Sequence, residues 1–79
     1  MSITQEQLQF IINSDVELMA SYLQSDCGLT VSEALGRIYN SRIYRKLIDT
    51  DTGLYLQSAD YLYDLLMEEI EGVRGRANA

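Results

Sequence analysis

A long amphipathic stretch near the start of the chain places the strongest constraint on the fold. Apolar side chains recur there at the three- and four-residue spacing of one helix face: Leu8, Ile12, Val16, Met19 and Leu23. Ile11, Leu18 and Tyr22 are expected to widen this face. Thr4 followed by Gln7 is a capping-box pattern, and Gly28 is placed to end the helix in a left-handed conformation. The sequence therefore predicts a helix from about Gln5 to Cys27.

Two shorter helices are expected next. Thr30 and Glu33 repeat the capping-box pattern, and the predicted apolar face that follows comprises Val31, Ala34, Leu35, Ile38 and Tyr39. Asn40 and Ser41 indicate a break, because both side chains compete for backbone hydrogen bonds. Ser41 would then cap a third helix from Arg42 to about Ile48. A single helix kinked at Asn40 is the alternative.

A turn separates these helices from the last one. Residues 49–53 (DTDTG) combine short polar side chains with a glycine. The match to a calcium-binding loop fails, because Gly53 occupies a ligand position and Leu54 stands where glycine is required. Residues 54–57 are expected to form an extended segment on the core. Ser58 would cap a last helix that ends at Gly72, followed by a frayed tail over 73–79.

These elements predict one all-α domain over residues 1–79, with its ordered core at about 4–71. We expect a small three- to four-helix bundle with a short extended segment before the last helix. The chain contains no proline, which fits a helical protein. The predicted core is Leu8, Ile12, Val16, Met19, Leu23, Leu35, Ile38, Leu47, Ile48, Leu62, Leu65, Leu66 and Ile70.

The composition argues against several classes of protein. One cysteine, Cys27, excludes an intrachain disulfide, and histidine is absent. We see no secretory signal and no apolar stretch of the ~20 residues that span a bilayer, so we expect a cytoplasmic protein without membrane contact. The net charge of −6 makes nucleic-acid binding an unfavoured prediction. No motif indicates a metal site or a cofactor, and we expect no enzyme activity.

A run of basic residues is the most informative feature for function. Arg37, Arg42, Arg45 and Lys46 lie within ten residues without an intervening acid, and the last three share a helix face. Three interpretations compete: a solvated face or one that pairs with the acidic last helix, a docking patch for an acidic protein, and DNA contact by a helix-turn-helix-like pair at about 31–48. Protein is favoured over DNA, because acidic helices repel phosphates. The predicted partner-binding residues are Arg42, Arg45, Lys46, Tyr44 and Tyr55.

Four segments of the sequence also resemble a known group of proteins: ITQEQLQFII, LTVSEAL, IYNSRIYRKLIDTDTGLYLQS and ADYLYDLLMEE. The chain is similar, over about residues 3–71, to short bacterial proteins of uncharacterised function that are often encoded beside a protein with an ADP-ribosyltransferase-like fold. That arrangement resembles a toxin and its antitoxin or accessory partner. The resemblance implies a role through a partner protein encoded by an adjacent gene and supplies no catalytic residues. Exposed tyrosines in so small a chain also make a homodimer a possible assembly.

Overall fold

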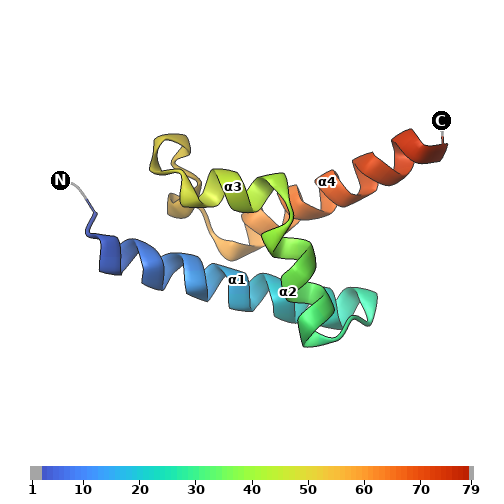
Figure 1. Ribbon diagram of the computed structural model, residues 1–79, viewed down its shortest axis with the longest axis horizontal. Coiled ribbons are helices and arrows are strands. Elements are labelled where there is room, and N and C mark those ends of the chain that lie inside the picture. Colours follow the sequence, from blue (N-terminus) through green and yellow to red (C-terminus); the bar gives the residue numbers. More distant parts are fainter. Residues whose placement is uncertain (1–2, 79) are drawn as a thin grey trace.

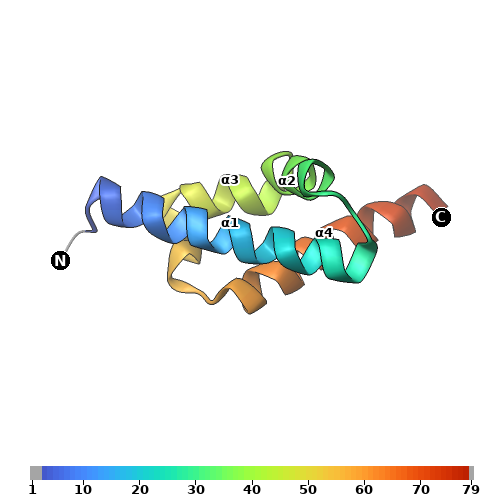
Figure 2. The same ribbon diagram turned by 90° about the horizontal axis from the view of Figure 1, so that it is seen from below.

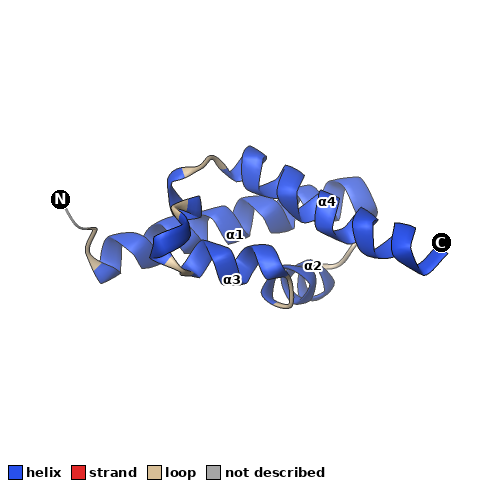
Figure 3. Cartoon of the chain, turned by 90° about the horizontal axis from the view of Figure 1, so that it is seen from above, coloured by secondary structure: helices blue, strands red, loops and turns tan. Residues whose placement is uncertain are grey.

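Four α-helices and two short 3₁₀ turns make up the chain. The computed structural model describes the backbone of residues 3–78 and the side chains of residues 3–72. The helices are α1 (Gln5–Cys27), α2 (Val31–Tyr39), α3 (Arg42–Ile48) and α4 (Ala59–Asn78), and the 3₁₀ turns η1 (Thr50–Thr52) and η2 (Leu54–Leu56) separate α3 from α4. Within residues 3–78 there is no strand, as Figure 3 shows. The predicted all-α class is confirmed.

The predicted helix starts are confirmed by their hydrogen bonds. Thr4 and Gln7 form a complete capping box, as do Thr30 and Glu33. The Ser41 hydroxyl accepts a hydrogen bond from the Tyr44 amide at the start of α3, which confirms the break between α2 and α3. Each helix therefore begins where a side-chain acceptor satisfies its free amides, and the loops between them stay short.

The elements wrap around one long helix. α1 runs along most of the 45 Å length of the molecule (Figure 1), and α2 turns back across its C-terminal half. α3 and the first half of α4 lie on the same side of α1, and the second half of α4 extends beyond the other helices. The molecule is only 18 Å deep along its shortest axis, so most elements expose at least one face.

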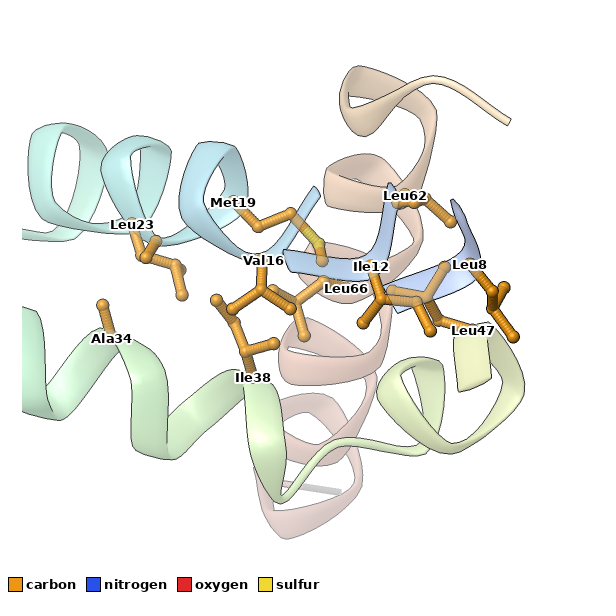
Figure 4. Packing of buried hydrophobic residues seen from close by; sticks show 11 residues of the cluster. Leu8, Ile12, Val16, Met19, Leu23, Ala34, Ile38, Leu47, Leu62 and Leu66 are labelled. Carbon is orange, nitrogen blue, oxygen red and sulfur yellow. The ribbon is translucent and has the colours of Figure 1, made fainter. Parts of the chain in front are cut away.

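The core forms where α1 meets the other three helices (Figure 4). Its fully buried large side chains are Met19, Leu23, Ile38, Leu47, Leu62 and Leu66. Leu8, Ile12 and Val16 continue it along α1. These residues belong to the predicted core, while Leu35, Leu65 and Ile70 are half-buried around it. Helical spacing thus identifies the centre of the core.

Four apolar residues that were assigned to packed faces lie at the surface. Leu18, Val31, Tyr39 and Ile48 are each exposed by about half. Ile48 ends α3, where the buried pair Ile43 and Leu47, four residues apart, already defines the inward face. A residue one step beyond Leu47 points about 100° away from it, which carries Ile48 into solvent.

Two predictions about local structure are also wrong. The segment before α4 is not extended: the Leu56 and Gln57 amides donate to the Gly53 and Leu54 carbonyls, which gives the 3₁₀ turn η2. An extended segment without a partner strand would leave these groups unpaired. Gly72 does not end α4, which continues to Asn78, and its φ is not positive. The predicted frayed tail falls on this continuation, and its side chains and Ala79 lie outside the described residues.

Candidate functional site

The predicted basic face exists on α3 and points into solvent. Arg42, Arg45 and Lys46 are all exposed, and Arg37 is exposed at the end of α2. The three α3 cations fall within roughly 100° of the helix circumference because they are spaced by three and four residues. Seen from above, α3 lies on the side of α1 that faces the viewer (Figure 3). We define this set, Arg42, Arg45 and Lys46, as the basic face.

The helix that carries this face is held at both ends. At its start, the Glu69 carboxylate of α4 accepts hydrogen bonds from the amides of Arg42 at 3.0 Å and Ile43 at 3.1 Å. Near its end, the Thr52 hydroxyl donates to the Lys46 carbonyl oxygen. A seven-residue helix is marginal on its own, because helix nucleation costs more free energy than so few hydrogen bonds return. These contacts therefore fix the orientation of α3 against α4.

The predicted aromatic residues contribute unequally. Tyr44 is half-buried and packs edge-to-face on Tyr39, with ring centroids 5.0 Å apart. Tyr39, half exposed, extends this pair to the surface, and Ile48 follows Arg45 around α3. The basic face is thus bordered by an apolar edge that comprises Tyr39, Tyr44 and Ile48. Tyr55 is half-buried on η2 and packs against the core.

The acids closest in sequence to the basic face are engaged in local contacts. The Asp49 carboxylate accepts a hydrogen bond from the Asp51 amide, which belongs to the turn chemistry predicted for residues 49–53. Glu69 contacts α3 through backbone amides. The structure therefore places α4 beside the start of α3, as an internal pairing requires, but Glu69 makes its contact with backbone amides of α3.

A hollow between α1 and α4 was not predicted from the sequence. The Tyr22 hydroxyl of α1 donates to Asp60 of α4 at 2.5 Å, and the Tyr63 hydroxyl of α4 donates to Asp26 of α1 at 2.8 Å. The two rings meet edge-to-face at 5.1 Å. Tyr22 and Asp26 are spaced by four residues and Asp60 and Tyr63 by three, so each pair shares a helix face. Sequence spacing does not show that the two faces meet.

The two tyrosine–aspartate hydrogen bonds in this hollow cross-link α1 and α4. The hydrogen bond to Asp60 raises the pKa of Tyr22, and burial together with the Asp26 hydrogen bond raises the pKa of Tyr63. Both phenols therefore stay protonated at neutral pH and act as donors to the carboxylates. A tyrosine that served as a base or nucleophile would need its pKa lowered.

One buried carboxyl group in α1 has no counterpart in the predictions. Asp15 is 8% exposed, and its Oδ2 atom has no hydrogen-bond partner among the described residues. Burial raises the pKa of this carboxyl group, because desolvation disfavours the charged form. Its position on the buried side of α1, between Ile12 and Met19, is readable from helical spacing.

Residues 3–72 contain no cluster of three or more acidic or cysteine side chains arranged to hold a metal ion. In the same part of the chain, no helix combines the length and the apolar character needed to cross a bilayer. Comparisons with protein-family models, with curated proteins and with solved structures gave no match.

Proposed function

We propose that this chain is a small non-enzymatic protein-interaction module and that the basic face of α3 binds an acidic partner protein. The observation that carries the proposal is the rigid presentation of Arg42, Arg45 and Lys46 on a helix held at both ends. A surface that is ordered before binding loses less conformational entropy when the complex forms. The fixed orientation of α3 thus favours partner binding by the basic face over the alternative that these cations are only solvated.

The residues around the basic face support a protein partner. Protein interfaces are enriched in arginine and tyrosine, and the apolar edge of Tyr39, Tyr44 and Ile48 lies beside Arg45. An acidic partner would meet the three cations and could cover this edge. Tyr55, the fifth predicted contact residue, is half-buried against the core. It would contact the partner only through the part of its side chain that is exposed.

The biological role that we propose follows the resemblance in the sequence. Short chains of this kind, encoded beside an ADP-ribosyltransferase-fold protein, would act as the antitoxin or accessory subunit of that neighbour. In this proposal the partner is the product of the adjacent gene, the complex forms in the cytoplasm, and the chain supplies binding and no catalysis.

Charge reversal on α3 tests the proposed site. We expect the Arg42→Glu, Arg45→Glu double variant to lose most of its affinity for the partner while the domain stays folded, because both side chains are exposed. The matched control is Arg37→Glu, an exposed reversal on α2. Partner capture from a nuclease-treated host lysate, followed by calorimetric titration of the identified protein, measures the effect. Equal affinities of the double variant and the control would refute the site.

DNA binding by α2 and α3 is the competing prediction. The break at Asn40–Ser41 fits a helix-turn-helix, but the Glu69 carboxylate occupies the N-terminus of α3. In a helix-turn-helix, residues at the start of the second helix contact base edges, where a carboxylate would repel the phosphates. A DNA affinity that falls steeply with salt, and that the double variant abolishes, would favour this alternative.

A further inference from the structure

A second surface of the molecule, on α1, lacks the charges expected of a solvent-facing helix. Seven positions of α1 fall within roughly 100° of its circumference, away from the core face. They are Gln7, Phe10, Ile11, Ser14, Leu18, Ser21 and Ser25, and we call them the outer stripe. None is charged, although the chain carries twelve acidic and six basic residues. The exposed charges nearest to the stripe, Glu6 and Glu17, lie along one border, and the buried Asp15 lies along the other.

The outer stripe is open and partly apolar. Phe10 is 74% exposed and Leu18 is 47% exposed, and Ile3, Gln7, Phe10 and Ile11 line a shallow hollow of about 590 Å³ together with Glu6. Seen from below, α1 lies in front of the other helices along most of its length (Figure 2). Single exposed apolar residues are common, but an uncharged stripe that extends over ~27 Å of helix is typical of a packing face.

We propose that the outer stripe packs antiparallel against the outer stripe of a second copy, about a two-fold axis at Ser14. In this register Phe10 of one copy meets Leu18 of the other, and Gln7 meets Ser21. The Phe10–Leu18 contact, which the two-fold axis repeats, is apolar, and the small serines allow the two helices to approach closely. A two-fold dimer is the commonest assembly of soluble proteins, and it requires such a self-complementary surface.

The distribution of charge favours contact between two copies through the outer stripe over contact through other faces of the chain. Two copies with a net charge of −6 repel each other, so they associate best through a surface without charge. In the proposed register the nearest exposed acids, Glu6 of one copy and Glu17 of the other, are offset by five residues, about 7–8 Å along the axis. The Debye length is about 8 Å at physiological ionic strength, so salt screens this repulsion. Self-association should therefore strengthen as salt increases.

The register is tested by disulfide trapping. In a Cys27→Ser background, which removes the exposed native thiol, the Ser14→Cys variant should form a disulfide-linked dimer under mild oxidation. The matched control is Ser21→Cys on the same stripe, because its two copies would be separated by ~21 Å along the axis, beyond the reach of a disulfide. Trapping of both variants to the same extent, or of Ser21→Cys alone, would overturn the proposed register.

The assembly itself is tested by sedimentation velocity over a range of protein and salt concentrations. We expect a monomer–dimer equilibrium that Leu18→Glu weakens by roughly tenfold or more in Kd, since the new carboxylate would face Phe10 of the other copy. Asn13→Glu, an equal charge change at an exposed α1 position outside the stripe, should weaken it much less. A monomer at every concentration, or a dimer that both substitutions weaken equally, would overturn the proposal. The basic face takes no part, so this test is independent of the proposed function.

Discussion

Removal of the Glu69 side chain should loosen α3, the helix on which the proposed function depends. The carboxylate of Glu69 accepts hydrogen bonds from the amides of Arg42 and Ile43, and it places negative charge at the positive end of the α3 dipole. A hydrogen bond to a charged group contributes about 1.5–3 kcal/mol. The Arg42 amide is exposed, so water replaces part of its bond in the variant, whereas Ile43 is buried. We therefore expect Glu69→Ala to lower the free energy of unfolding by about 1.5 kcal/mol.

The measurement is urea unfolding followed by far-UV circular dichroism, supported by thermal melts. For a domain of this length, about 1.5 kcal/mol corresponds to a fall in Tm of roughly 6–12 °C. Glu68→Ala is the matched control, since it makes the same substitution at the neighbouring, exposed position of α4 and removes no contact with α3. Glu69→Gln keeps an acceptor without the charge and should lie between the control and Glu69→Ala.

Equal stabilities of the variant and its control would refute the proposed role of Glu69. If Glu69→Ala and Glu68→Ala unfold within about 0.5 kcal/mol of each other, the limit within which surface substitutions usually fall, the carboxylate does not hold α3. If the control matches the wild type while Glu69→Ala loses both stability and partner affinity, the basic face depends on the orientation of α3 as well as on its charges.

Two further predictions concern the buried Asp15 of α1 and the half-buried Tyr63 of α4. Asp15→Asn should raise Tm most at neutral pH. Burial raises the pKa of the Asp15 carboxyl group in the folded chain. The protonated carboxyl group therefore stabilises the fold fully below its ordinary pKa of about 3.9, and this stabilisation is lost as the pH rises through the folded-state pKa. Melts across this pH range check the prediction, and a variant that is equally stabilised at acidic and neutral pH would contradict it. Tyr63→Phe removes the hydrogen bond to Asp26 and should cost about 0.5–1.5 kcal/mol in urea unfolding. The half-exposed Tyr61→Phe serves as its control, and equal stabilities of the two variants would contradict the cross-link.

The helix boundaries were predictable because their determinants are local. Thr4, Thr30, Ser41 and Ser58 each cap the helix that follows through an amide three residues later, and this pattern is visible in the sequence. Gly28 likewise adopts the left-handed conformation that ends α1. The end of α4 was not predictable in this way, because a glycine inside a helix costs only about 1 kcal/mol and its neighbours outweigh it.

The contacts between helices were not predictable, because they depend on which faces meet. Helical spacing puts Tyr22 on the same face as Asp26 and Tyr63 on the same face as Asp60, but only the fold shows that the two faces meet. Glu69 was one acid among five in the last helix, and nothing in its neighbourhood distinguished it as the carboxylate that holds α3. For the candidate site, the sequence identified the exposed cations, and the fold explained why their orientation is fixed.

The two proposed surfaces lie on opposite sides of the molecule, and this arrangement links them. The outer stripe belongs to α1, which lies in front of α3 when the molecule is seen from below (Figure 2), and the basic face belongs to α3, which lies in front of α1 when it is seen from above (Figure 3). A dimer formed through the stripes would therefore leave both basic faces uncovered and directed away from each other. Such a dimer can hold two partner molecules, and a partner that is itself dimeric would gain avidity only where its two sites match this spacing. Salt should affect the two contacts in opposite ways. It weakens partner binding, because it screens the attraction between the basic face and an acidic partner, and it strengthens the dimer, because it screens the repulsion between like-charged copies. At high ionic strength we thus expect the dimer to persist after the partner has dissociated.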